Sequence, residues 1–135
     1  SYGLSVFDSA FFELSTLMEE YLNIFNCLSL IIFDKNGIII SEYYSNTIEP
    51  NIYLELLENV KEHLFLLKRM QEEQEPDYNF FSIGDKILSY LHKIEYKKYW
   101  YYVSVLIEED KKESLLEKFS DLINEIMKIF KKLFR

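Results

Sequence analysis

The stretch that most constrains the fold is "CLSLIIFDKNGIIISEYY", residues 27–44, in which two apolar runs flank one polar turn. The runs are rich in β-branched and aromatic residues, and Asn36 and Gly37 tolerate the positive φ of a tight turn, so a β-hairpin is predicted. A strand that is apolar on both sides must have both faces buried by other elements of the fold. The hairpin therefore predicts a sheet between helices, with "LSLII" and "GIIIS" in the middle of that sheet.

Helical periodicity surrounds this hairpin. The segment "DSAFFELSTLMEEYLNIF" places apolar residues at spacings of three and four, which predicts an amphipathic helix with Asp8 or Ser9 as its cap. A second apolar stripe predicts a helix from about residue 51 to about residue 70. A third stripe predicts a long terminal helix, which Asp110 and Glu113 would open as a capping box.

Three further strands are predicted within residues 79–110, with breaks at "GDK" and "YKK". The strand "KILSYLHKIE" mixes polar with apolar residues, which suits a strand nearer a sheet edge or one with a solvent-exposed face. The acidic "QEEQEPD" (71–77) predicts a surface loop. The expected fold is α+β: a single five-stranded antiparallel sheet with helices on both faces, in the order α-β-β-α-β-β-β-α. A chain of 135 residues is expected to form one domain, residues 1–135.

Charge and cysteine content limit the partners and the compartment. The formal net charge is -8, so the summed field repels nucleic acid and anionic lipid. The basic C-terminus contains Lys128, Lys131, Lys132 and Arg135. Stabilisation of the helix end by these cations is the favoured interpretation, and a weak membrane contact is the lesser alternative. Cys27 is the only cysteine and is expected to be a buried, unreactive residue, so a cytoplasmic location is predicted.

No residue pattern indicates catalysis, a cofactor or a metal site. His63 and His92 are the only histidines, and no HxH, HExxH or Cys/His cluster accompanies them. His63 is expected at the surface or at its boundary, and His92 on a half-exposed strand position. The glycines lie far apart and form no phosphate-binding loop. A protein that is not an enzyme is therefore expected.

The most unusual segment is "YKKYWYYV", in which aromatic residues follow one another along a predicted strand. Strand alternation sends Trp100 and Tyr102 to one face of the sheet and Tyr99 and Tyr101 to the other. Packing beneath the helices is the favoured interpretation. The alternative is a partner-contact patch made by Tyr96, Tyr99, Trp100 and Tyr101, because Tyr and Trp are enriched at interface hot spots.

The element order resembles that of the roadblock family, and the related longin and profilin-like folds share much of it. "LSLIIFDKNGIIISEYY" looks like the opening hairpin of the family, and "KILSYLHKIEYKKYWYYVSVLIEED" looks like its closing strands. The heavy aromatic content and the acidic loop depart from a simple roadblock protein. The strong first helix favours roadblock over longin.

The resemblance implies a noncatalytic scaffold that forms a homodimer, or a heterodimer with a related subunit, and engages a small GTPase or a trafficking complex. Roadblock proteins typically pair through the central helix and the strand after it. Here these elements are the helix near residues 51–70 and the strand at residues 79–83, whose edge would otherwise leave N–H and C=O groups unpaired. The implied dimer interface consists of Leu57, Val60, Leu64, Phe80, Phe81 and Ile83.

Ligand sensing is the alternative to the scaffold function. A small-molecule sensor of the profilin-like or PAS type would place a pocket between the sheet and a helix, lined by aromatic residues such as Tyr90 and Trp100. Ligand binding to such a pocket would raise the thermal stability of the protein.

Overall fold

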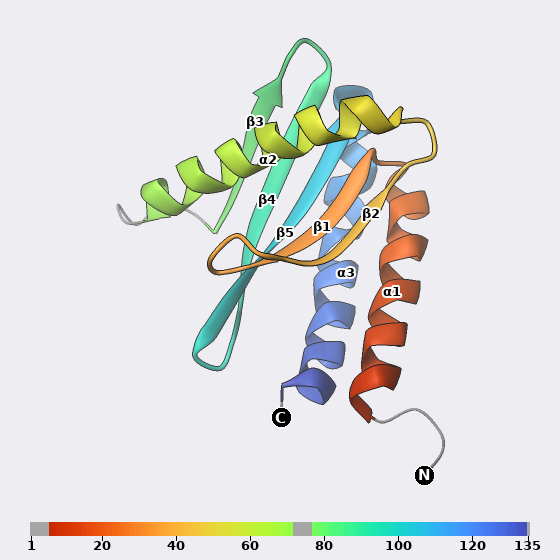
Figure 1. The fold of residues 1–135 in the computed structure, drawn as a ribbon, viewed down its shortest axis with the longest axis vertical. Helices are drawn as coiled ribbons and strands as arrows, with labels where there is room; N and C mark the ends of the chain where they lie inside the picture. Colours follow the sequence, from red (N-terminus) through yellow and green to blue (C-terminus); the bar gives the residue numbers. More distant parts are fainter. Residues whose placement is uncertain (1–5, 72–76, 135) are drawn as a thin grey trace.

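The computed structural model describes residues 6–71 and 77–134, and its order of helices and strands confirms the predicted α+β class (Figure 1). Positions 72–76 of the predicted acidic loop lie outside the described residues. The elements are α1 (Val6–Phe25), β1 (Ser29–Asp34), β2 (Ile39–Tyr44), α2 (Pro50–Gln71), β3 (Tyr78–Ile83), β4 (Ile87–Tyr96), β5 (Tyr99–Glu108), the 3-10 turn η1 (Glu109–Lys111) and α3 (Lys112–Leu133).

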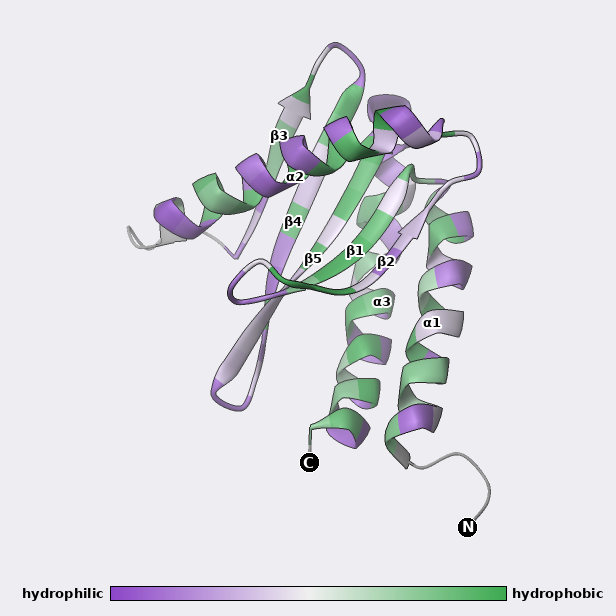
Figure 2. Ribbon diagram, in the orientation of Figure 1, coloured by the Kyte–Doolittle hydropathy of each residue, from purple (hydrophilic) through white to green (hydrophobic). Residues whose placement is uncertain are grey.

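The five strands form one antiparallel sheet in the order β2-β1-β5-β4-β3. The helices α1 and α3 pack together on one face, and α2 crosses the other face (Figure 1). Alternate side chains of β1 enter the two cores: Leu30 and Ile32 lie under α1 and α3, whereas Ile31 and Phe33 lie under α2. The apolar colouring of β1 and of the second half of β5 in Figure 2 reflects this double cover.

The second apolar run of the hairpin does not lie in the middle of the sheet, so this part of the prediction was wrong. β2 pairs only with β1 among the described strands, and its side chains are mostly half-buried. The central position beside β1 belongs to β5, which comes much later in the chain. β4 lies one strand in from the β3 edge, which agrees with the prediction of a position near an edge.

The β1–β2 turn depends on Asp34 and Gly37. Asp34 Oδ1 accepts hydrogen bonds from the backbone N–H groups of Asn36 and Ile38, at 2.8 and 2.9 Å. Of the predicted pair, Gly37 alone has a positive φ, +82°, so Asn36 does not need the left-handed conformation expected for it. A turn followed by one left-handed residue is a common way to close a hairpin loop.

The helix starts also differ from the prediction. α3 is preceded by η1 and its N-cap is Lys111, with no side-chain cap hydrogen bond, so the predicted capping box of Asp110 and Glu113 was wrong. α1 already includes Val6, which places Asp8 inside the first turn instead of at the cap. A carboxylate there still interacts favourably with the helix dipole. None of the helices in the described residues is long and apolar enough to cross a lipid bilayer.

Candidate protein-interaction site

The helix α2 has one face in the protein core and one apolar face in solvent. Val60, Leu64 and Leu67 are buried against the sheet. On the opposite side, Phe65 is 62% exposed, and further exposed apolar residues accompany it. We define the outer apolar face of α2 as Leu54, Phe65 and Leu66; Ile52 is also exposed but, two residues before Leu54, projects from a different side of the helix. A run of exposed apolar side chains on one helix is a common feature of interaction sites.

A shallow hollow of about 540 Å³ lies on the same helix, lined by Glu58, Lys61, Glu62, Phe65 and Leu66. Its lining mixes two apolar side chains with charges of both signs. A protein surface with complementary charges fits such a hollow better than a small apolar ligand does, because a ligand pocket normally encloses most of its ligand.

The edge strand β3 lies beside this helix. Within the described residues β3 pairs only with β4, from Tyr78 opposite His92 to Ile83 opposite Ile87. Its other edge therefore presents backbone N–H and C=O groups to solvent. Phe81 on this strand is 38% exposed. The outer apolar face of α2 and the free edge of β3 together form the candidate interaction site.

The structure separates the residues of the implied dimer interface. Val60 and Leu64 belong to the core of this chain. Phe80 points to the opposite face of the sheet, where its ring centroid lies 4.6 Å from that of Tyr90. Leu57 and Ile83 are half-buried against the α2 core, and Phe81 is the most exposed of the set. Sequence reasoning missed the outer face of α2 because it followed the stripe that faces the sheet.

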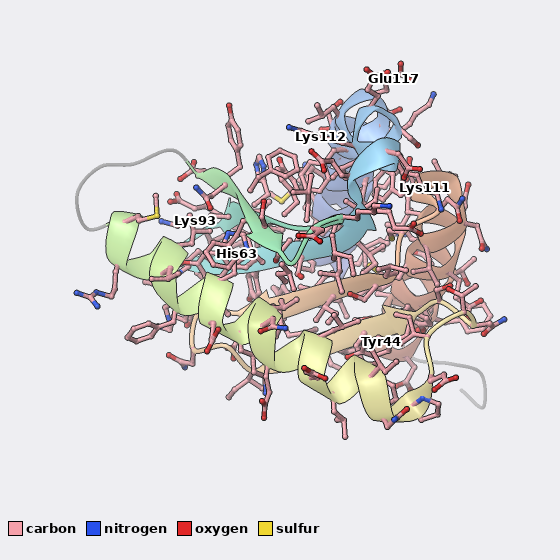
Figure 3. The ribbon with its side chains drawn as sticks, turned by 90° about the horizontal axis from the view of Figure 1, so that it is seen from above. Tyr44, His63, Lys93, Lys111, Lys112 and Glu117 are labelled. Carbon is pink, nitrogen blue, oxygen red and sulfur yellow. The ribbon has the colours of Figure 1, made fainter. Side chains whose placement is uncertain are left out.

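His63 joins α2 to the two outer strands, and its prediction as a surface or boundary residue was wrong. The side chain is 1% exposed and lies between α2 and the sheet (Figure 3). Nε2–H donates to Asn79 Oδ1, and Nδ1 accepts from Ser89 Oγ, each at 2.8 Å. Phe81 stacks on the imidazole with ring centroids 5.3 Å apart.

Both histidines are adapted to the neutral form. Burial lowers the pKa of His63, and the hydrogen bond with Asn79 opposes this effect in part. Burial also lowers the pKa of His92, against the opposing charge of Asp77. His92 is half-exposed, as predicted, and its Nδ1 lies 2.9 Å from the Tyr90 hydroxyl. The spacing of His63 from Val60 and Leu67 already placed it on the buried stripe, which is the signal that could have revealed it.

The aromatic strand β5 divides between the two faces as predicted. Tyr101 packs against Phe130 and Phe134 beneath α3, with ring centroids 4.8 and 5.6 Å apart. Tyr102 is buried in the core on the α2 side. Tyr96 is half-buried against the same two phenylalanines. Of the proposed contact residues, Tyr99 is 57% exposed and Trp100 is half-buried, so these two remain accessible.

The pocket expected for a small-molecule sensor is not formed by the residues suggested for it. Tyr90 packs in the core under α1 and α3, whereas Trp100 packs against the core under α2. The sheet separates them, and one pocket cannot be lined by both.

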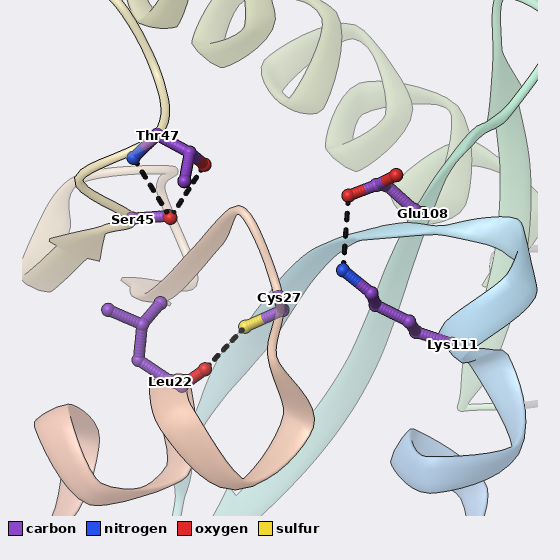
Figure 4. Close-up of polar contacts among 6 residues, drawn as sticks. All are labelled: Leu22, Cys27, Ser45, Thr47, Glu108 and Lys111. Atoms are coloured by element: carbon purple, nitrogen blue, oxygen red, sulfur yellow. Dashed lines mark hydrogen bonds and ion pairs between the residues drawn. The ribbon is translucent and has the colours of Figure 1, made fainter.

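Cys27 has no reactive character. It lies just before β1, not within it, and burial raises the pKa of its thiol to about 12. The Sγ atom points to the backbone oxygen of Leu22 at 3.9 Å, as Figure 4 shows beside the Ser45–Thr47 and Glu108–Lys111 contacts. A neutral thiol is a poor nucleophile. Among the described residues, no three His, Cys, Asp or Glu side chains gather as a metal site would require.

Comparison with solved structures identifies the fold. Myxococcus xanthus MglB superposes with a TM-score of 0.64 at 21% identity, covering 93% of this chain and 92% of that chain. The structure "MglB with tetrameric arrangement" gives 0.63 at 12% identity, covering 99% and 96%. MglC from Myxococcus xanthus gives 0.55 at 14% identity, covering 84% and 98%.

The fold is that of the roadblock proteins. The likeness extends over nearly the whole chain and confirms the resemblance inferred from the element order. No protein-family model matches the sequence, and no curated protein matches it. At these identities the likeness concerns the fold alone.

Proposed function

We propose that the protein is a noncatalytic adaptor that dimerises through α2 and β3 and engages a small GTPase or a GTPase-regulating complex. The observation that carries the proposal is the outer apolar face of α2 beside the free edge of β3, on a chain with the roadblock fold. The GTPase partner rests on the roadblock resemblance. We also propose that residues 1–135 act as one domain and that the protein works in the cytoplasm.

The free edge supports pairing with another strand. A strand edge with exposed backbone groups is a template for strand addition, and many proteins protect it with charges, prolines or a covering segment. β3 has the sequence Tyr-Asn-Phe-Phe-Ser-Ile, without a charge or a proline. A second β3 would satisfy these groups and bury Phe81.

The charges on α2 support a second copy of the same chain as the partner. Glu55, Glu58 and Glu62 outweigh Lys61 in the first two thirds of the helix, whereas its last turn carries Lys68 and Arg69. Two such helices packed antiparallel about a twofold axis would bring the acidic part of each beside the basic part of the other. The charges of α2 are therefore complementary to those of a second α2, and a homodimer needs no different subunit to match them.

The test is the mass in solution by light scattering over a dilution series. We expect twice the chain mass of 16.3 kDa for the native protein. Phe65→Glu should lower the mass to that of one chain, because a charge replaces an exposed apolar contact. Phe12→Glu is the matched control, since Phe12 is 68% exposed on α1, on the other side of the sheet. A native monomer at all concentrations, or a dimer unaffected by Phe65→Glu, would contradict the proposed interface.

The GTPase part of the proposal needs a separate experiment. Purified small GTPases, loaded with GDP or with a non-hydrolysable GTP analogue, are passed over the immobilised protein. Retention that depends on the nucleotide would support an adaptor role. Dimerisation without retention of any GTPase would keep the interface and reject the partner.

A further inference from the structure

A group of lysine and aromatic side chains surrounds Trp100, the only tryptophan of the chain. Lys35 Nζ lies 5.2 Å from the ring centroid of Trp100, and Lys93 Nζ lies 5.3 Å from it. Lys35 Nζ also lies 5.7 Å from the ring centroid of Tyr99. Lys68 Nζ donates to the backbone oxygen of Lys35 at 2.6 Å. We call Lys35, Lys68, Lys93, Tyr99 and Trp100 the Trp100 cluster.

The three lysines of the cluster come from parts of the chain that are far apart in sequence. Lys35 belongs to the β1–β2 turn, Lys68 to the last turn of α2 and Lys93 to β4. Each lysine contact has a local role, since an ammonium group is attracted to the face of an aromatic ring. Lys35 and Lys93 both lie within 5.3 Å of the centroid of the Trp100 ring, so positive charge gathers around the indole and favours an anion beside it.

The carboxylates near the cluster neutralise it only in part. Glu95 pairs with Lys93 at 3.4 Å, and its own side chain is 67% exposed. The Asp34 and Asp77 carboxylates also lie near: after burial, their negative charges add to the raised pKa values of Tyr101 and Tyr102. Asp34 Oδ1 in addition accepts the hydrogen bonds of the β1–β2 turn. In the described part of the chain, neither Lys35 nor Lys68 has a carboxylate within ion-pair distance.

We propose that the Trp100 cluster binds a carboxylate-rich segment of a partner protein. Trp and Tyr are enriched at the centres of protein interfaces, and a side-chain carboxylate matches the ammonium group of Lys35, which has no carboxylate within ion-pair distance in the described part of the chain. The net charge of -8 opposes a long polyanion such as nucleic acid, which would cross the acidic remainder of the surface.

A bilayer is a poorer match for the same cluster. The side chain of Lys93 is 20% exposed, and Trp100 and Lys35 are half-buried. A narrow peptide can place a Glu or Asp side chain into such a surface, whereas a flat lipid layer contacts the residues that protrude most. Lys68 is the one cluster residue that the proposed pairing of α2 also uses, so the cluster is tested at Lys35 and Lys93, which lie outside α2.

The experiment uses the fluorescence of Trp100 as the reporter, because no other tryptophan contributes to the emission. The native chain is titrated with a Glu-rich peptide and with the same peptide carrying Gln in place of Glu. We expect a saturable change in emission with the Glu-rich peptide only, and weaker binding as the salt concentration is raised. Lys35→Gln combined with Lys93→Gln should weaken the affinity at least about tenfold, since charge-assisted hydrogen bonds are lost.

The matched control is Lys86→Gln combined with Lys118→Gln, which changes the net charge equally at exposed positions outside the cluster. This variant should bind the Glu-rich peptide like the native chain, and circular dichroism checks that both variants are folded. Equal affinity in the two variants, or no response of the native chain at low salt, would overturn the proposal. A response to phosphatidylserine vesicles without a response to the peptide would also overturn it, in favour of a lipid surface.

Discussion

Replacement of His63 by leucine tests whether this buried imidazole holds α2 on the sheet. Leucine fills most of the same space but cannot hydrogen-bond, so the variant removes both 2.8 Å hydrogen bonds without a large cavity. Ser89 is fully buried and its hydroxyl would lose its partner, while Asn79 is half-buried and can regain water. One orphaned buried polar group costs about 1–3 kcal/mol. We expect the free energy of unfolding to fall by that amount.

The assay is urea unfolding at constant protein concentration, because a dimer would make the midpoint depend on concentration. The matched variant is His63→Leu combined with Ser89→Ala, which removes both ends of the buried hydrogen bond. We expect this double variant to recover part of the lost stability, because no hydroxyl remains unsatisfied. A His63→Leu protein as stable as the native chain would refute the reasoning, and so would a double variant whose two effects simply add.

Three further predictions follow from buried polar and ionisable groups. The pKa values of His63 and His92 are lowered in the folded protein, so below about pH 6.5 the unfolded chain binds more protons than the folded chain. The contribution of these histidines to the free energy of unfolding should therefore be complete above that pH and decrease as the pH falls below it. Urea unfolding over a pH series measures this dependence. Ser104→Ala should leave the free energy of unfolding within about 1 kcal/mol of the native value or raise it, because Ser104 Oγ is buried without a hydrogen-bond partner in the described part of the chain. A larger loss of stability would contradict this prediction. Cys27 should react with a thiol reagent at neutral pH only after urea is added, and rapid labelling of the native protein would show that its thiol is accessible.

Local pattern was sufficient to predict the order of the elements. Spacings of three and four identified all three helices, and the "DKNG" turn between apolar runs identified the hairpin. Alternation along β5 correctly sent Tyr101 and Tyr102 to opposite faces. These predictions succeeded because a helix or strand buries side chains at a fixed period, which the sequence displays directly.

The sequence predicted which helix and strand form the candidate site, but not which of their residues are exposed there. The roadblock resemblance pointed to α2 and β3, but Val60 and Leu64 proved to face the sheet, and Phe65 on the opposite side is exposed. An apolar residue on an amphipathic helix does not reveal whether it faces its own core or a partner. That assignment needs the position of the helix on the sheet.

The sequence by itself determined which segments are helices and strands, because hydrogen bonds within a helix and alternation along a strand are local properties of the chain. Tertiary structure alone decided that β2 is an edge strand and that His63 meets Asn79 and Ser89, which lie 16 and 26 residues away in sequence. The same holds for the lysines that surround Trp100. The physical reason is that strand order and helix placement minimise exposed apolar surface over the whole chain, so they depend on residues that no local window contains.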